Sequence, residues 1–114
     1  MTLETFLNKL KTTPKDIDFT DTISVIESNY IFTPTAFKNG ELNNNAGENS
    51  GSCKLLAFAK LQQLTKEETL VCFGKYYFEE VLNDLNGNGH QNIRNFMKTG
   101  FEGLVFEGMP LRER

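Results

Sequence analysis

Hydrophobic residues near the start of the chain recur at the three- and four-residue spacing of two amphipathic helices. The repeating sets are Leu3, Phe6, Leu7 and Leu10, then Phe19, Ile23, Ile26 and Tyr30. Thr2 is placed to cap the first helix, and Pro14 ends it because proline lacks the amide proton that a helix interior needs. The second helix is expected over about residues 22–29. The residues available to cap it are Asp18, Thr20 and Asp21.

The stretch from Tyr30 to Leu61 organises the rest of the chain. Asn39-Gly40 favours a tight hairpin turn because both residue types accept positive φ, so we expect residues 35–38 to pair with residues 41–43. A polar, glycine-containing loop follows over residues 43–51.

An apolar helix closes this stretch. It is expected to start near Cys53, with Ser50 or Ser52 as its cap. Residues 55–61 are apolar nearly all round, Lys60 excepted, so this helix should be the buried one.

The second half of the chain contains a strong helix start. Thr65 and Glu68 form a capping box, in which each side chain accepts a hydrogen bond from the other residue's amide. The helix is expected to run to about Asn83, with Leu70, Phe73, Tyr77 and Val81 on its apolar face. Gly74 inside it should weaken the helix by about 1 kcal/mol, which a close crossing of another element would explain.

The remaining pattern predicts a turn, a helix and a strand. Residues 86–89 form the turn, and the helix that carries Ile93, Phe96 and Met97 ends at Gly100. Residues 104–106 read as a strand that joins the hairpin in one sheet, and the tail from Pro110 is expected to fray. The prediction is one α+β domain over residues 1–114, mostly helical. About five helices surround a buried central helix, with a small antiparallel sheet made of a hairpin near 35–43 and a strand near 103–107.

Charge and composition narrow the classes of partner. A chain of 114 residues with ten Phe can fill one core. A net charge of −3 and a pI near 5.2 argue against a nucleic-acid partner. No apolar stretch approaches the thickness of a bilayer, and the N-terminus lacks a signal pattern. We therefore expect a cytoplasmic protein without a membrane partner or cofactor, whose two cysteines stay reduced.

The order of these motifs resembles the HopJ type III effector family of small bacterial proteins. The residues that carry the resemblance are Asp21-Thr22-Ile23 with Val25-Ile26, Tyr30–Thr35 with Phe37, Asn39 and Gly40, Asn43, Ala46-Gly47, Asn49, Gly51–Lys54, Phe73-Gly74 with Tyr76-Tyr77, His90, Asn92–Arg94, Phe96-Met97, Gly100, Gly103 and Phe106. The resemblance spans roughly residues 3–111 and implies a fold but little chemistry. The family name implies secretion into a host cell. The amphipathic pattern already begins at Leu3 and leaves no free arm, so we expect action in the cytoplasm of the producing cell.

One candidate metal site lies between two predicted helices. Asp84, Asn86, Asn88 and Gly89 match the opening of a calcium-binding loop, with oxygen ligands at every second position. The match fails at the twelfth position, where Asn95 replaces the chelating glutamate. We interpret the segment as a turn that connects two helices, and predict no metal.

The candidate catalytic residues are Cys53 and His90, with Asn92 to orient the imidazole. Cys53 is expected in the first turn of its helix, where amide N–H groups and the helix dipole favour a thiolate. The alternative is a packed, inert cysteine, because sequence spacing does not show that Cys53 and His90 meet.

A set of hydroxyl and amide side chains is the third candidate. Its members are Tyr30, Thr33, Thr35, Asn43, Asn45, Asn49, Ser50, Ser52 and Arg94. Such groups near a helix N-terminus can form an anion or small-ligand pocket, or they can satisfy the backbone of an ordered loop. The leading hypothesis is a non-enzymatic module that binds an unknown small molecule or protein. The alternative is a thiol-dependent hydrolase or transferase that uses Cys53 and His90.

Overall fold

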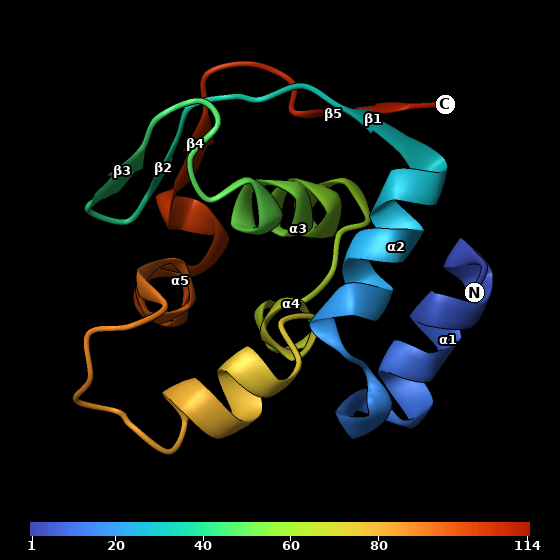
Figure 1. The fold of residues 1–114 in the computed structure, drawn as a ribbon, viewed down its shortest axis with the longest axis horizontal. Coiled ribbons are helices and arrows are strands. Elements are labelled where there is room, and N and C mark those ends of the chain that lie inside the picture. The colour runs from blue at the N-terminus through green and yellow to red at the C-terminus, as the bar shows by residue number, and fades with distance from the viewer.

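The helix α3 (Ser50–Leu61) lies at the centre of the computed structural model, which describes residues 1–114 (Figure 1). Its apolar body is buried as the sequence predicts: Leu55, Leu56, Phe58 and Ala59 are each 0% exposed. The rings of Phe6 and Tyr30 meet the Phe58 ring edge-on at 6.0 and 6.1 Å. The core of the domain is therefore built around this one helix.

Four further α-helices surround α3. They are α1 (Leu3–Thr12), α2 (Phe19–Asn29), α4 (Lys66–Val71) and α5 (Gln91–Thr99). Short 3-10 helices η1 (Pro14–Asp16) and η3 (Gly100–Gly103) follow α1 and α5. The Thr2 hydroxyl accepts from the Thr5 amide at 3.0 Å, and Asp18 is the cap of α2. The predicted first two helices and their caps are confirmed, although α2 begins three residues earlier than expected.

The predicted helix from Thr65 to Asn83 is interrupted at Gly74. The capping box is confirmed, because the Thr65 hydroxyl accepts from the Glu68 amide at 3.1 Å. However, α4 ends at Val71, and the chain resumes as a π-helix, η2 (Tyr76–Val81). Gly74 has φ +60, and an added Cβ would lie 2.9 Å from the Phe19 backbone nitrogen. The predicted close approach exists, but it is to the start of α2 and requires a positive φ that breaks the helix.

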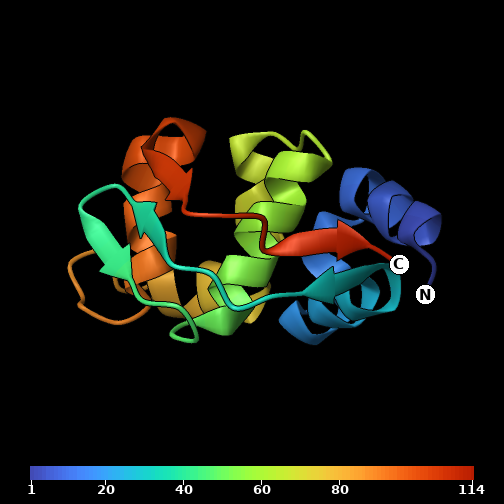
Figure 2. The same ribbon diagram turned by 90° about the horizontal axis from the view of Figure 1, so that it is seen from above.

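A long antiparallel ribbon lies across α3 as a second layer (Figures 1 and 2). Its strands are β1 (Tyr30–Phe32), β2 (Phe37–Asn39), β4 (Leu104–Phe106) and β5 (Leu111–Glu113). Tyr30 lies opposite Glu113 and Asn39 opposite Leu104, so the register is unchanged from end to end. The Thr33 amide donates to the Pro110 carbonyl at 2.8 Å and the Glu107 amide to the Ala36 carbonyl at 3.0 Å, which joins the two strand pairs.

Two predictions about this ribbon are wrong. The tail does not fray at Pro110, because β5 pairs with β1 in a two-stranded sheet that the sequence did not reveal. The hairpin turn is displaced by one residue: β3 (Leu42–Asn44) places Leu42 opposite Asn39, so Gly40-Glu41 forms the turn. The three-stranded sheet of the hairpin and residues 104–106, in the order β3-β2-β4, is confirmed.

Candidate functional site

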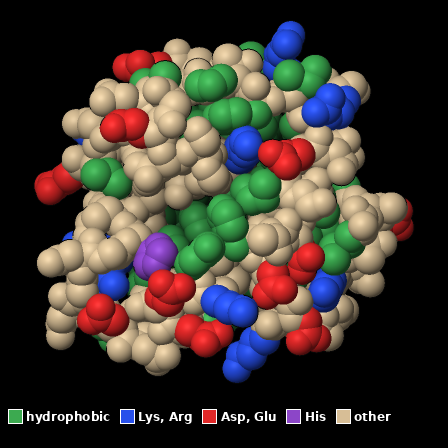
Figure 3. Space-filling view, viewed as in Figure 1, with side chains coloured by type: hydrophobic (Ala, Val, Ile, Leu, Met, Phe, Trp, Pro, Cys, Tyr) green, Lys and Arg blue, Asp and Glu red, His purple; other side chains and the backbone are tan.

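A hollow of about 500 Å³ opens where α3, α5, η2 and the start of α2 meet. Its apolar lining consists of Phe19, Leu42, Phe73, Tyr76 and Ile93, and its polar lining of Asn49, Ser52, His90, Gln91 and Asn92. Figure 3 shows hydrophobic side chains gathered in the middle of this face, with the single histidine at their edge. The hollow therefore combines an apolar floor with a polar rim.

Three aromatic rings make the floor continuous. The Phe19 ring stacks on Phe73 at a centroid distance of 6.2 Å and meets Tyr76 edge-on at 5.4 Å. Gly51 permits this packing, because a Cβ there would lie 2.9 Å from the tip of the Phe19 ring. Tyr76 is 40% exposed, so part of this aromatic surface is open to a ligand.

Two helix N-termini reach the rim without side-chain caps. The residues before α3 and α5, Asn49 and His90, adopt the left-handed conformation with φ 51 and 55. Neither side chain accepts a hydrogen bond from its helix, and the amides of residues 50–52 and 91–93 have no partner in the protein. These amides and the two helix dipoles place partial positive charge at the same opening.

Buried asparagines hold the two helix ends in place. Asn92, at the start of α5, donates to the Asn44 side-chain oxygen at 3.0 Å and accepts from Asn39 at 3.0 Å. Asn49, before α3, donates to the same Asn44 oxygen at 2.7 Å. Asn39 is 0% exposed, and its own side-chain oxygen has no partner. The hairpin thus fixes α3 and α5 relative to each other through one polar network.

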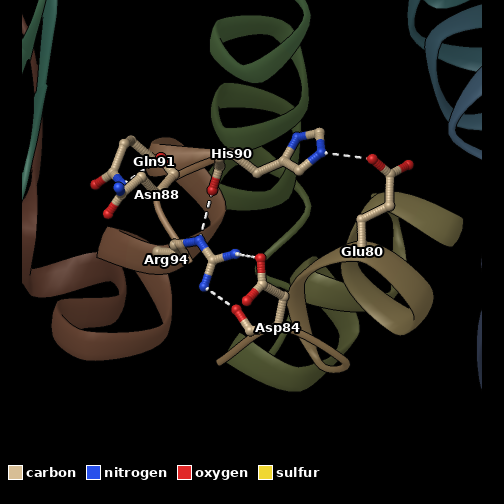
Figure 4. Close-up of polar contacts among 7 residues, drawn as sticks. Glu80, Asp84, Asn88, His90, Gln91 and Arg94 are labelled. Atoms are coloured by element: carbon tan, nitrogen blue, oxygen red, sulfur yellow. Dashed lines mark hydrogen bonds and ion pairs between the residues drawn. The ribbon is translucent and has the colours of Figure 1, made fainter. Parts of the chain in front are cut away.

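His90 bridges the rim to η2. Its Nε2 lies 3.0 Å from a Glu80 carboxylate oxygen (Figure 4). Its ring lies 5.2 Å from the Tyr76 ring. The Glu80 carboxylate is half-exposed and engages only this nitrogen. His90 Nδ1 has no hydrogen-bond partner, which leaves it free for a ligand at the rim.

The loop between η2 and α5 does not fit a cation. Arg94 is 9% exposed, and its guanidinium donates to the backbone carbonyls of Asp84 and Gly89 (Figure 4). Its positive charge occupies the inside of the loop, where a calcium ion would have to sit. No group of three His, Cys, Asp or Glu side chains could hold a metal ion, and the bonds from Arg94 brace the turn that contains Asp84, Asn86 and Asn88.

The expected activation of Cys53 is wrong. The helix begins at Ser50, three residues earlier than predicted, and neither Ser50 nor Ser52 caps it. The Cys53 amide is already bonded to the Asn49 carbonyl at 3.0 Å, and its thiol donates to the Thr35 carbonyl at 3.7 Å. Burial raises the pKa of the Cys53 thiol to about 11, despite that bond. The thiol therefore stays protonated at neutral pH.

The candidate catalytic residues do not form a hydrogen-bonded dyad. His90 and Asn92 line the hollow, whereas Cys53 does not. The His90 ring contacts Glu80 and Tyr76, and the Asn92 amide is used by the asparagine network. The Cys53 thiol is bonded to the Thr35 carbonyl and forms no hydrogen bond with the imidazole.

The predicted ligand-binding residues separate into two groups. Asn49 and Ser52 line the hollow. Tyr30, Thr33, Thr35, Asn43 and Arg94 do not. The Tyr30 hydroxyl is bonded to Gln62 at 2.7 Å, and the Thr35 hydroxyl donates to the Thr33 carbonyl at 2.8 Å. The Tyr30 and Thr35 hydroxyls are therefore engaged within the protein.

Sequence reasoning missed the aromatic floor. Phe19 and Phe73 look like ordinary core positions in the sequence, and Tyr76 belongs to the family resemblance without indicating a ligand site. Their common location depends on Gly74, whose positive φ turns the chain between α4 and η2. The two glycines at the floor, Gly51 and Gly74, were the available signal.

One family model and one solved structure match this chain. Residues 3–111 match the family described as HopJ type III effector protein, whose name implies secretion into a host. A crystal structure of a protein of unknown function, VPA0580, shares 53% sequence identity and superimposes with a TM-score of 0.98. The match covers 100% of this chain and 95% of that one. No curated protein matches. No helix of the structure is long and apolar enough to cross a membrane. The match over nearly its whole length places this chain in the HopJ type III effector family.

Proposed function

We propose that this HopJ-family protein is a non-enzymatic module that binds a small molecule in the hollow between α3, α5 and η2. The observation that carries the proposal is the hollow itself, a volume of about 500 Å³ with an aromatic floor and a polar rim. Small-molecule sites have typical volumes of about 300–1,000 Å³ and combine apolar walls with a few polar groups.

The polar groups at the rim define the chemistry of the ligand. The Ser52 hydroxyl has no hydrogen-bond partner, and neither do the first amides of both helices. Amide N–H groups donate, so the matching ligand group is rich in acceptor oxygens. The ligand therefore has a planar apolar body for the floor and a carboxylate-like end for the rim.

The absence of an activated nucleophile at the rim supports binding over catalysis. The Cys53 thiol has its pKa raised to about 11 by burial and lies outside the lining of the hollow. A thiol-dependent reaction needs a thiolate within reach of its base.

The test is a ligand-detected NMR screen with small aromatic carboxylates, each paired with the amine of the same ring. We expect carboxylates such as phenylacetate to bind, and the matched amine, phenethylamine, to bind more weakly. Removing part of the floor with Tyr76→Ala should weaken binding about two- to tenfold, which is the value of an aromatic contact.

Leu82→Ala is the matched control for Tyr76→Ala. Leu82 is 37% exposed, close to the 40% of Tyr76, and follows η2 without lining the hollow. Binding should survive in this variant. Equal loss in both variants, or no preference for carboxylates over amines, would contradict the proposal.

A further inference from the structure

A second, mostly apolar groove lies on the ribbon side of α3, away from the hollow. It has a volume of about 430 Å³ and runs between the last turns of α3 and the ribbon segment 106–111. Its apolar walls include Ala57, Leu61, Phe106, Met109 and Leu111. None of these residues lines the hollow, so the two cavities are separate sites.

Two large apolar side chains of this groove face solvent. Leu61 is 52% exposed and Met109 is 71% exposed, one from each wall. Exposed apolar side chains that converge on one concave surface mark a binding site more often than isolated ones do. Methionine also adapts its shape to different apolar partners, because it has three rotatable bonds and a polarisable sulfur.

Lys60 is the one charged residue in the lining. Its ammonium lies 5.9 Å from the centre of the Phe106 ring, and no carboxylate forms an ion pair with it. No aspartate or glutamate lines the groove. The groove thus offers one unpaired positive charge beside a continuous apolar surface, which complements a ligand with one negative charge and a long apolar part.

We infer that the groove binds an amphipathic monocarboxylate of medium chain length, with its carboxylate at Lys60 and its acyl chain between Leu61 and Met109. A single ammonium suits a singly charged carboxylate, because a phosphate group is usually held by several donors. The volume lies within the range of small-molecule sites. This inference does not depend on the hollow being a binding site.

The test uses the whole chain and two probes with the same apolar chain, decanoate and decyltrimethylammonium, below their micelle concentrations. Calorimetry gives the dissociation constants, and amide NMR shifts locate the site. We expect decanoate to bind at residues 57–61 and 106–111 at least tenfold more tightly than decyltrimethylammonium. Octanoate should bind more weakly than decanoate, by up to about fourfold for each missing methylene.

Variants of the groove test the contact with the ligand's charged head group separately from the contact with its acyl chain. Lys60→Gln should remove the preference for decanoate over decyltrimethylammonium, whereas Lys38→Gln, which replaces an exposed lysine outside the groove, should preserve it. Met109→Gln should weaken both probes. Leu85→Gln, at a side chain 67% exposed outside the groove, should weaken neither.

Three results would overturn the inference. One is equal affinity of the parent protein for both probes. Another is a head-group preference that persists in Lys60→Gln. The third is the absence of saturable binding at the groove, whether the shifts are confined to the hollow or no binding is seen at all. In both cases the groove is not the site.

Discussion

The body of α3 and its N-terminal end differ in what surrounds them: the body is buried among apolar side chains, and the end has unpaired polar groups. In the body, Leu55, Leu56 and Phe58 are fully buried and belong to the hydrophobic core. At the N-terminal end, the amides of residues 50–52 are unpaired, Gly51 and Ser52 line a hollow, and Asn49 is held by a bond to Asn44. A ligand site needs polar groups that have no hydrogen-bond partner within the protein, and leaving them unpaired lowers the stability of the fold. The apolar side chains buried along the body of α3 offset that loss.

The largest effect should come from the body. Phe58→Ala removes a ring that contacts Phe6 and Tyr30, so we expect the free energy of unfolding to fall by about 3–5 kcal/mol. Denaturant unfolding measures it. Phe78→Ala is the control, and because Phe78 is only partly buried its loss should be smaller. Equal losses in the two variants would mean that α3 is not the centre of the core.

Gly74→Ala should be the next most damaging change. A Cβ at φ +60 is strained, and here it would also lie 3.0 Å or less from two backbone atoms of residues 17–19. We expect a loss of about 2–4 kcal/mol in the free energy of unfolding. Gly89→Ala, where nothing lies within 4 Å, should change stability little. A neutral Gly74→Ala would contradict the break between α4 and η2.

The asparagine network should contribute less to the free energy of unfolding than the core side chains do, but more than exposed side chains do. Asn44→Ala leaves the buried amide of Asn92 and the amide of Asn49 without their common acceptor, so we expect a loss of about 1–3 kcal/mol. The neighbouring Asn43→Ala removes an exposed side chain of the same strand and should cost almost nothing. Similar melting temperatures for the two variants would show that the network does not fix the hollow.

Titration of the two cysteine thiols should have the smallest effect on stability, with none expected at neutral pH. Burial raises the pKa of Cys53 to about 11 and that of Cys72 to about 12, so iodoacetamide should react slowly with both, and with Cys53 first as the pH rises. The folded state holds these protons more tightly than the unfolded state. Stability should therefore be unaffected below about pH 9 and fall between pH 9 and the folded pKa values. Rapid alkylation of Cys53 at pH 7 that also depends on His90 would restore the thiol-enzyme alternative.

The sequence predicts the body of α3 better than its polar end, for a physical reason. A run of apolar residues such as Leu55–Leu61 identifies a buried helix from local pattern alone, and the capping box at Thr65 does the same for a helix start. The start of α3 depends on Asn49 in a left-handed conformation that a bond to Asn44 helps to hold, and Asn44 is in turn bonded to Asn92, which is distant in sequence. No local pattern encodes it.

Long-range pairing explains the other differences between prediction and structure. The strand β5 exists because Leu111–Glu113 meets β1, and β1 is too short and too close to Pro34 to be predicted alone. Within the candidate site, Asn49, Ser52, His90 and Asn92 were identified as polar residues of interest from sequence. That they line one hollow, while Cys53 does not, follows from packing that brings α3 and α5 together through Asn44.

The most direct measurement concerns the amides of the two helix ends, residues 50–52 of α3 and 91–93 of α5. Phenylacetate can be titrated into isotope-labelled protein while their NMR shifts are followed. If both helices form one binding site, the NMR shifts of the two sets of amides should change together, with the same dissociation constant. The shifts of the amides of residues 57–61 should not change. Shifts at only one helix, two different dissociation constants, or no saturable shift at either end would contradict a single ligand site at the hollow.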